Sequence, residues 1–202
     1  MPIATNPNLK VMGDSILFQS QPQVTMEDIA TDEFQETLET LKRKQFEANG
    51  IGIAAPQVGW AARVLCLGIS DDNRERYPLV SDIPFQFWIN PQITHFSKDT
   101  CWAWEGCLSV PGIRGWVNRP SAVNVCGSNQ KGERIEVELD GFSARVMQHE
   151  IDHLNGVLFP MRMEETKLII PNASMENQAL WPEGWPTPQA RITRPGEISV
   201  DK

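Results

Sequence analysis

Hydrophobic positions recur at helical spacing in the first quarter of the chain, over residues 31–48. Acidic residues occupy the first turn of this stretch, basic residues lie nearer its end, and Asn49-Gly50 follows. This order matches the charge preference of helix ends and the glycine that commonly follows a helix. We therefore predict an amphipathic helix that ends at the glycine. Its buried face would carry Phe34, Leu38, Leu41 and Gln45.

Short apolar segments separated by Gly, Pro and Asn fill the middle of the chain and predict strands. The clearest segment alternates Ile135, Val137 and Leu139 with charged residues, as expected of a half-buried strand. The predicted strands are residues 63–69, 85–89, 93–96, 122–126 and 134–139.

A second helix is predicted over residues 143–155, closed by Gly156. Helices and strands are segregated along the chain, which favours an α+β fold over alternating β-α-β units. We expect short, mostly antiparallel strands packed around this central helix.

The two ends of the chain differ from its body. Residues 1–24 predict an extended arm laid over the body. Residues 172–202 are rich in Pro, Trp and polar residues without periodicity, so we expect one catalytic domain over residues 1–171 followed by a tail. Trp181 and Trp185 would either clamp the tail to the body or leave it disordered.

Composition and charge narrow the class of protein. A chain of 202 residues, 41% of them hydrophobic, can bury one core. The net charge of −8 with scattered Lys and Arg argues against direct nucleic-acid binding. There is neither an apolar run of membrane-spanning length nor a secretory signal, so we expect a cytoplasmic protein. The four cysteines form no C-x-x-C pair, and free thiols are expected.

The second predicted helix contains the sequence Gln148-His149-Glu150-Ile151-Asp152-His153, an H-E-x-x-H pattern. Residues four apart overlap on one helix face, so two imidazoles there can hold one divalent cation. The glutamate between them could exchange a proton with water. The same short pattern also arises by chance among ordinary helix residues. Two of the three histidines of the chain fall in it, and the third, His95, is expected to be structural.

A catalytic metal normally has three protein ligands, and Cys107 is the candidate for the third. It lies in residues 104–112, with Gly106 before it and Pro111-Gly112 after it, which predicts a loop. A buried, unreactive cysteine is the alternative, and is the expectation for Cys66, Cys101 and Cys126. Long-motif metalloproteases place a histidine six residues beyond the second, where this chain has Phe159.

A glycine-rich segment, Gly50-Ile51-Gly52-Ile53-Ala54-Ala55-Pro56-Gln57, follows the first predicted helix. Together with Glu105-Gly106-Cys107-Leu108-Ser109 and the H-E-x-x-H helix, in this order, it resembles the signature of peptide deformylases. The resemblance extends over about residues 18–163. It implies a hydrolase that removes the formyl group from N-terminal formyl-methionine.

The resemblance also implies the role of each matching residue. Cys107, His149 and His153 would hold one metal ion, typically Fe²⁺, with Zn²⁺, Ni²⁺ or Co²⁺ able to replace it. Glu150 would be the general base and later the general acid. The oxyanion donors would be the Gln57 side chain and the Leu108 backbone N–H.

Substrate binding in the family resembles strand addition, so backbone groups near Ile51, Gly52 and Gly106 would pair with the nascent formyl-Met peptide. The methionine pocket would involve Ile51, Glu105, Phe142, Arg145 and Val146, although Phe142 and Val146 are equally consistent with core packing. Arg114 would either brace Glu105 or be a solvated surface residue. Phe142 is bulkier than the aliphatic residue associated with that position, which could narrow the pocket.

Two further expectations concern the tail and the alternatives. Some family members end in a basic helix that meets the ribosome, whereas this Pro-rich tail has few clustered Lys or Arg, which argues against ribosome association through it. The alternatives are a different H-E-x-x-H peptidase and a non-catalytic metal-binding relative. Retention of Glu150 and Gln57 argues against the second, because a structural site needs neither a base nor an oxyanion donor.

Overall fold

The computed structural model describes residues 9–69, 83–164, 166–185 and 187. Two helices precede the first strand, α1 (Met26–Ile29) and α2 (Asp32–Glu47). Thr31 caps α2 by accepting a hydrogen bond from the Phe34 N–H, as preferred at helix starts. The predicted buried face is confirmed, but Asn49 rather than Gly50 adopts the positive φ, 52°, after the helix. Asparagine tolerates this region better than most residues.

Within the described residues the strands form two antiparallel sheets. The five-stranded sheet has the order β1-β2-β3-β6-β7, and the three-stranded sheet has the order β4-β5-β8. The bounds are β1 (Gly52–Ala54), β2 (Val64–Leu67), β3 (Gln86–Phe96), β4 (Thr100–Cys107), β5 (Val110–Pro120), β6 (Ala122–Ser128), β7 (Arg134–Asp140) and β8 (Ile169–Pro171).

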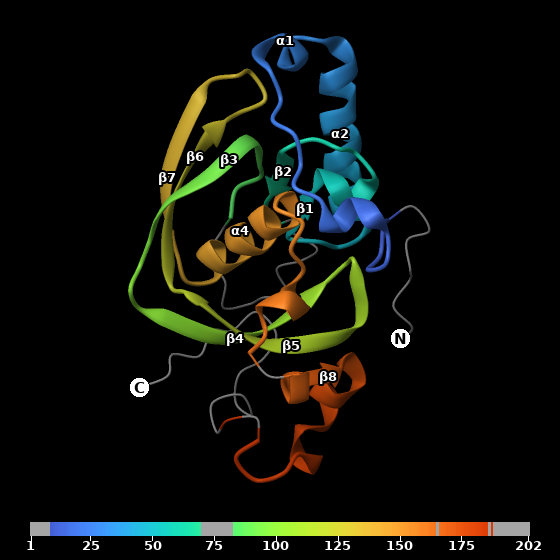
Figure 1. Ribbon diagram of the computed structural model, residues 1–202, viewed down its shortest axis with the longest axis vertical. Coiled ribbons are helices and arrows are strands. Elements are labelled where there is room, and N and C mark those ends of the chain that lie inside the picture. The colour runs from blue at the N-terminus through green and yellow to red at the C-terminus, as the bar shows by residue number, and fades with distance from the viewer. Residues whose placement is uncertain (1–8, 70–82, 165, 186, 188–202) are drawn as a thin grey trace.

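The second long helix, α4 (Gly141–Leu154), lies between the two sheets and contacts strands of both (Figure 1). Its buried residues include Ala144, Met147, Ile151 and Leu154, which follow helical spacing and join the core of the five-stranded sheet. The expected mixture of helices with antiparallel strands is confirmed. Because α4 is enclosed by two sheets, its polar side chains must find partners inside the protein.

The strands predicted at residues 85–89 and 93–96 are confirmed as extended segments, but they are one strand, β3, which begins at Gln86. Its pairing is irregular where Asn90 takes a φ of 52°. The Asn90 side chain hydrogen-bonds both backbone groups of Val24, which holds the N-terminal arm. Residues 104–112, expected as a loop, are the β4–β5 hairpin with its turn at Leu108 and Ser109. Gly and Pro signals hid this hairpin because they mark bulges as well as loops.

The ends of the chain pack on the body where they are described. The arm contains a short 3₁₀ helix, Ser15–Phe18, whose Leu17 is fully buried. After β8, the segment Asn172–Leu180 forms 3₁₀ turns, and both Trp181 and Trp185 pack against a hydrophobic cluster of the hairpin. Clamping is therefore confirmed for this part of the tail, whereas residues 188–202 lie outside the described residues. No helix in the described part of the chain has the length and apolar character needed to cross a membrane.

Candidate functional site

Helix α4 presents two histidines on one face. The ring centroids of His149 and His153 lie 5.1 Å apart, as expected from their four-residue spacing. His153 is buried, and its Nε2 lies 3.2 Å from the Cys107 Sγ at the end of β4. Within the described residues these three side chains form the one group whose donor atoms could share a metal ion, all within 4.8 Å of one another. The structure thus brings Cys107, the candidate third ligand, close to the two histidines of the helix.

The electrostatics of this group fit a divalent cation. Burial acts to lower the pKa of His149, but the hydrogen bond and negative charge of Cys107, followed by those of Glu105, outweigh it and raise that pKa well above its ordinary value. Burial and then the His149 charge lower the pKa of His153 well below its ordinary value. A cysteine sulfur beside two imidazoles is a donor set that suits a transition-metal ion, which binds these groups in their deprotonated forms.

Glu105 holds His149 from the side opposite the cluster. Its Oε2 lies 3.0 Å from His149 Nδ1. Burial favours the neutral acid, but the Arg119 charge and the hydrogen bonds from His149 and Arg119 keep the pKa of Glu105 well below its ordinary value. An ionised carboxylate can only accept, so His149 Nδ1 carries a proton, and Nε2 is the nitrogen that can bind a metal ion when it gives up its own proton.

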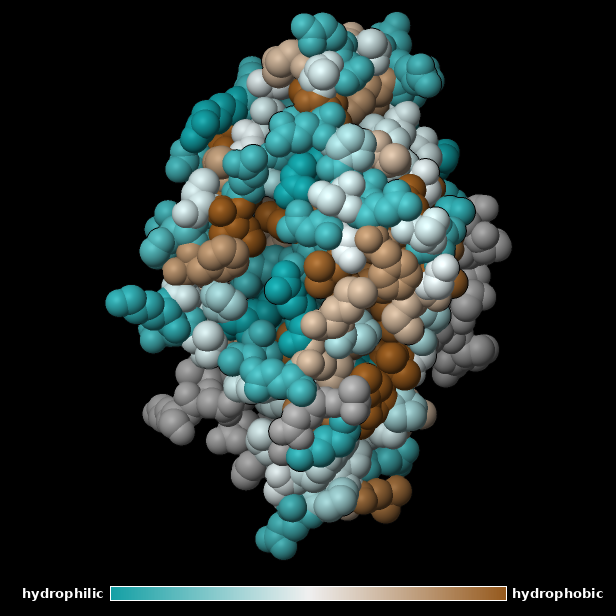
Figure 2. Space-filling model, in the orientation of Figure 1, coloured by the Kyte–Doolittle hydropathy of each residue, from teal (hydrophilic) through white to brown (hydrophobic). Residues whose placement is uncertain are grey.

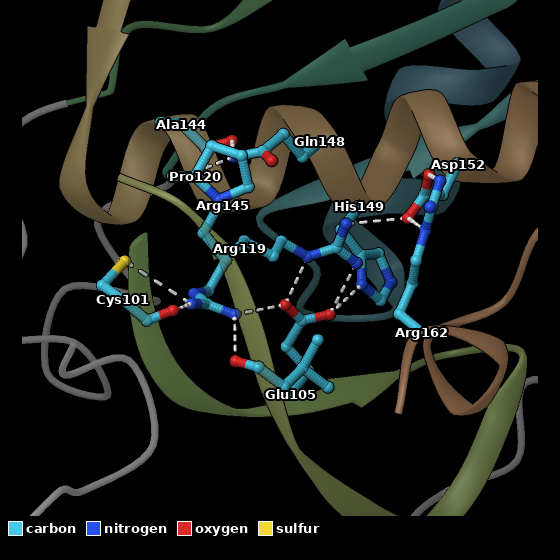
Figure 3. A network of polar contacts seen from close by, with 11 residues as sticks. Cys101, Glu105, Arg119, Pro120, Ala144, Arg145, Gln148, His149, Asp152 and Arg162 are labelled. Carbon is cyan, nitrogen blue, oxygen red and sulfur yellow. Dashed lines mark hydrogen bonds and ion pairs between the residues drawn. The ribbon is translucent and has the colours of Figure 1, made fainter. Parts of the chain in front are cut away.

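A buried network of charges positions Glu105 (Figure 3). Arg119 binds it through two hydrogen bonds, of 2.6 and 2.9 Å, and Arg145 adds a third, of 2.6 Å. Arg119 also binds Asp152, 2.7 Å away, which in turn pairs with Arg162. The network therefore connects β4, β5 and α4 around His149, one of the candidate metal ligands.

Arg119 and Arg145 brace Glu105 in this network, a role that the sequence did not assign to either of them. The charged end of Arg145, expected in a methionine pocket, is buried against Glu105 and the carbonyls of Val117 and Cys101. Sequence reasoning missed Arg119, because an arginine beside a strand end gives no local sign that it will be buried.

Glu150 lies next to the cluster in a different environment. Its side chain is buried and its Oε2 has no hydrogen-bond partner. Burial raises its pKa to about 7, with the Glu105 and Asp152 charges adding to the effect and His149 and Arg119 opposing it. A carboxyl group with this pKa can both take up and release a proton near neutral pH. Gly52 lets it fit, since a Cβ there would lie 2.7 Å from Glu150 Oε1.

The Gln57 amide is oriented by contacts at both ends. Gln57 follows β1 in a 3₁₀ helix, Ala55–Val58. Its Oε1 accepts a hydrogen bond of 2.8 Å from the Ala54 N–H. Its Nε2 donates to Ser109 Oγ at 3.1 Å and lies 3.8 Å from Cys107 Sγ. This places an amide donor beside the cluster, and Ser109 is a positioning contact that sequence reasoning missed.

The residues expected to bind a peptide lie around helix α4. Ile51 belongs to the core cluster against which the half-buried Phe142 and Val146 pack. Gly106 is exposed at the end of β4, and Leu108 begins the hairpin turn. The face in Figure 2 is hollowed near its centre, over α4, where hydrophilic residues lie between hydrophobic ones. His95 is exposed on β3, outside the cluster.

Comparisons with known proteins agree with this arrangement. The family model described as polypeptide deformylase matches residues 7–168. A peptide deformylase of Leptospira biflexa serovar Patoc (strain Patoc 1 / Ames) is 39% identical over 166 residues, covering 82% of this chain and 92% of the relative. Peptide deformylase 1 of Prochlorococcus marinus (strain MIT 9313) is 42% identical over 160 residues, covering 75% and 81%.

Solved structures give the same result. The Met-Ala-Ser-bound class I type b peptide deformylase from Acinetobacter baumannii has a TM-score of 0.73 and 36% identity, covering 77% of this chain and 96% of that one. A peptide deformylase from Synechococcus elongatus, in complex with actinonin, has a TM-score of 0.68 and 34% identity, covering 79% of each chain. From its signature segments, its fold and these relatives, the chain belongs to the polypeptide deformylase family.

Proposed function

We propose that this chain is a metal-dependent amide hydrolase that removes the formyl group from the N-terminal formyl-methionine of nascent polypeptides and releases formate. The observation that carries the proposal is the clustering of Cys107, His149 and His153 beside the buried Glu150 carboxyl group and the Gln57 amide. Family membership supports it. The peptide bound in the Acinetobacter relative, Met-Ala-Ser, is what such a reaction would leave.

Cys107, His149 and His153 would hold the metal, and Fe²⁺ is the proposed ion, with Zn²⁺, Ni²⁺ or Co²⁺ able to replace it. When bound, the ion would supply Lewis acidity, which polarises a carbonyl group and lowers the pKa of water. The side chains around the metal ligands orient them. Glu105 keeps the proton of His149 on Nδ1, so that Nε2 stays available as a donor.

Glu150 supplies proton transfer in both halves of the reaction. As the base, it takes a proton from the water that attacks the formyl carbon. As the acid, it delivers that proton to the departing amine, so that formate and a free N-terminus result. Its raised pKa, about 7, suits both steps. Its unpartnered Oε2 leaves one oxygen free of the protein's own hydrogen bonds.

Gln57 and Leu108 are the proposed oxyanion donors. The Ala54 N–H fixes Gln57 Oε1, which directs the Nε2 donor toward the Cys107 end of β4. A donor held in place before the reaction stabilises developing charge without reorganising. The Leu108 backbone N–H, in the adjacent turn, would provide the second donor.

The substrate would bind by strand addition beside β1 and the end of β4, with backbone groups of Ile51, Gly52 and Gly106 pairing with the peptide. Such pairing accepts many sequences. Selection would then rest on an apolar pocket for methionine that includes Ile51, Phe142 and Val146, which share one hydrophobic cluster. Glu105 and Arg145 would shape it indirectly, through the buried network.

The proposal extends to the domain division, the location and the partners of the chain. The catalytic unit would be residues 1–171, with residues 172–202 as an accessory tail. Formylated nascent chains arise where translation occurs, so the expected location is the cytoplasm. The acidic chain, with net charge −8, has little attraction for ribosomal RNA, so we expect it to act on the N-termini of nascent chains without direct nucleic-acid binding.

The test is formate release from formyl-Met-Ala-Ser by protein purified without oxygen and loaded with Fe²⁺ or Ni²⁺. Glu150→Gln is the matched control, because it preserves shape and removes the base. We expect the variant to keep one metal per chain and to be slower by about 10²–10⁴-fold. No formate from metal-loaded wild-type protein would overturn the proposal. Cleavage of an unformylated internal peptide bond would instead favour the peptidase alternative.

A further inference from the structure

Strand β4 has two faces with different tasks. Its odd-numbered residues meet α4: the Cys101 carbonyl accepts from Arg145, Glu105 binds His149, and Cys107 lies against His153. Its even-numbered residues point the other way, because side chains alternate along a strand. Trp102 and Trp104 both pack there on Trp116 of β5, with ring centroids 6.2 and 5.1 Å apart.

The outer face is covered by the end of the chain. Trp181 meets Trp104 with ring centroids 5.6 Å apart, and Trp185 lies 6.5 Å from Trp104 and 5.3 Å from Trp181. Under this cover Trp104 is 3% exposed and Trp116 is fully buried. Leu168 and Ile170 complete the same cluster. Figure 1 shows β8 and the segment after it on the side of β4 and β5 away from α4.

The hairpin needs such support because β4 is an edge strand. Among the strands that the structure describes, β4 pairs with β5 alone, and β8 pairs with the far side of β5 through residues 113–115. The position of β4 relative to α4 is therefore set by one strand neighbour and by the packing on its two faces. Edge segments with few supporting contacts are the first to open locally.

We propose that Trp181 and Trp185 are positioning residues, which clamp Trp104 from outside and so hold Glu105 and Cys107 against the histidines of α4. We call residues 172–185 the strap. It lies outside the part of the chain that matches the family model, which ends at residue 168. This inference rests on the proposed function, because the residues that the strap supports are the proposed metal ligands. Metal release, however, is measured separately from deformylation.

The test uses full-length Trp181→Ala/Trp185→Ala protein loaded with Co²⁺ or Zn²⁺. Metal release to a chromogenic chelator is timed at 25 °C, and deformylation is measured in parallel. The strap supports Glu105, which is the hydrogen-bond partner of the proposed ligand His149. Without the two tryptophans we therefore expect the metal to be released about tenfold faster, with a fall in kcat rather than a rise in KM. Trp181→Phe/Trp185→Phe, which keeps aromatic contacts, should restore slow release.

Leu180→Ala is the matched control, because Leu180 belongs to the strap but is 83% exposed and should release metal at the wild-type rate. Single Trp181→Ala serves if the double variant does not fold. A lower melting temperature with an unchanged rate of metal release at 25 °C would show that the two tryptophans are merely structural. That result would overturn the proposal that they position the metal ligands. Wild-type protein that binds no metal would overturn the proposed function itself, and the strap with it.

Discussion

At the residue scale, two buried carboxyl groups flank His149, and their surroundings act on them in opposite directions. Glu105 is held by two arginines, which keep it ionised in spite of burial. Glu150 has no such partner at Oε2, and burial raises its pKa to about 7. One carboxylate is thus a permanent acceptor and the other a group that can exchange a proton. Environments that separate two pKa values in this way assign acid–base roles.

Gln57 provides a test at the same scale. Replacing it with leucine removes the proposed oxyanion donor while keeping a side chain of similar size. We expect kcat to fall by roughly 10²–10³-fold, which corresponds to about 3 kcal/mol, with KM little changed. Steady-state kinetics on formyl-Met-Ala-Ser would measure both constants.

Ser109→Ala is the companion variant for this prediction, because it removes only the contact that orients Gln57 Nε2. It should lose roughly 1 kcal/mol, or about fivefold in kcat. If Gln57→Leu and Ser109→Ala lowered kcat equally, the Gln57 amide would act by holding the hairpin turn rather than by donating to the oxyanion.

At the element scale, α4 is bounded by two glycines with positive φ. Gly141, at its first position, has a φ of 51°, and Gly156, after its end, has a φ of 73°. Only the second is also crowded: a Cβ at Gly156 would lie 2.6 Å from the Phe18 carbonyl carbon, whereas a Cβ at Gly141 would meet nothing within 4 Å. The end of α4 is therefore packed tightly against the N-terminal arm.

This difference predicts a difference in stability. Gly141→Ala should cost about 1 kcal/mol, because alanine disfavours a positive φ. Gly156→Ala should cost more, roughly 3 kcal/mol, since backbone atoms must also move. Urea unfolding of the two variants beside wild type measures both. If the two alanines prove equally destabilising, the contact between the arm and the end of α4 is not rigid.

At the scale of the whole molecule, the candidate metal ligands join parts that are distant in sequence. Cys107 ends a strand of the three-stranded sheet, and the two histidines lie on the helix between the sheets. A cation bound by these side chains would connect the hairpin to α4. Ligand binding to the folded state alone should therefore stabilise the entire domain.

Metal removal should accordingly lower the melting temperature. At a free metal concentration about a hundred times Kd, the bound ion contributes about 2.7 kcal/mol, or roughly 5–10 °C for a chain of this size. Thermal unfolding with Ni²⁺ and with a chelator would show the shift. Glu150→Gln should keep it and His153→Ala should lose it. A shift that survives in His153→Ala would place the bound metal elsewhere.

Much of the fold was predictable from local patterns. The face of α2, the alternation in β7 and the extent of α4 follow from periodicities of 3.6 and 2, which depend on neighbouring residues alone. The β4–β5 hairpin was missed because Gly106 lies at an irregularity in the pairing of β4, and Pro111 and Gly112 lie within β5, where the sequence indicated a loop. Whether a tryptophan-rich tail packs depends on a surface formed elsewhere, so Trp181 and Trp185 left two possibilities open.

The sequence by itself determined the pairing of His149 with His153, because helical spacing brings residues four apart to one face. It also indicated Cys107 and Gln57 through the segments that resemble the family. Only the tertiary structure decided that Arg119 and Arg145 secure Glu105, that Ser109 orients Gln57 and that the strap covers Trp104. These contacts join residues far apart in the chain, and the charge of a side chain does not reveal which partner burial will bring to it.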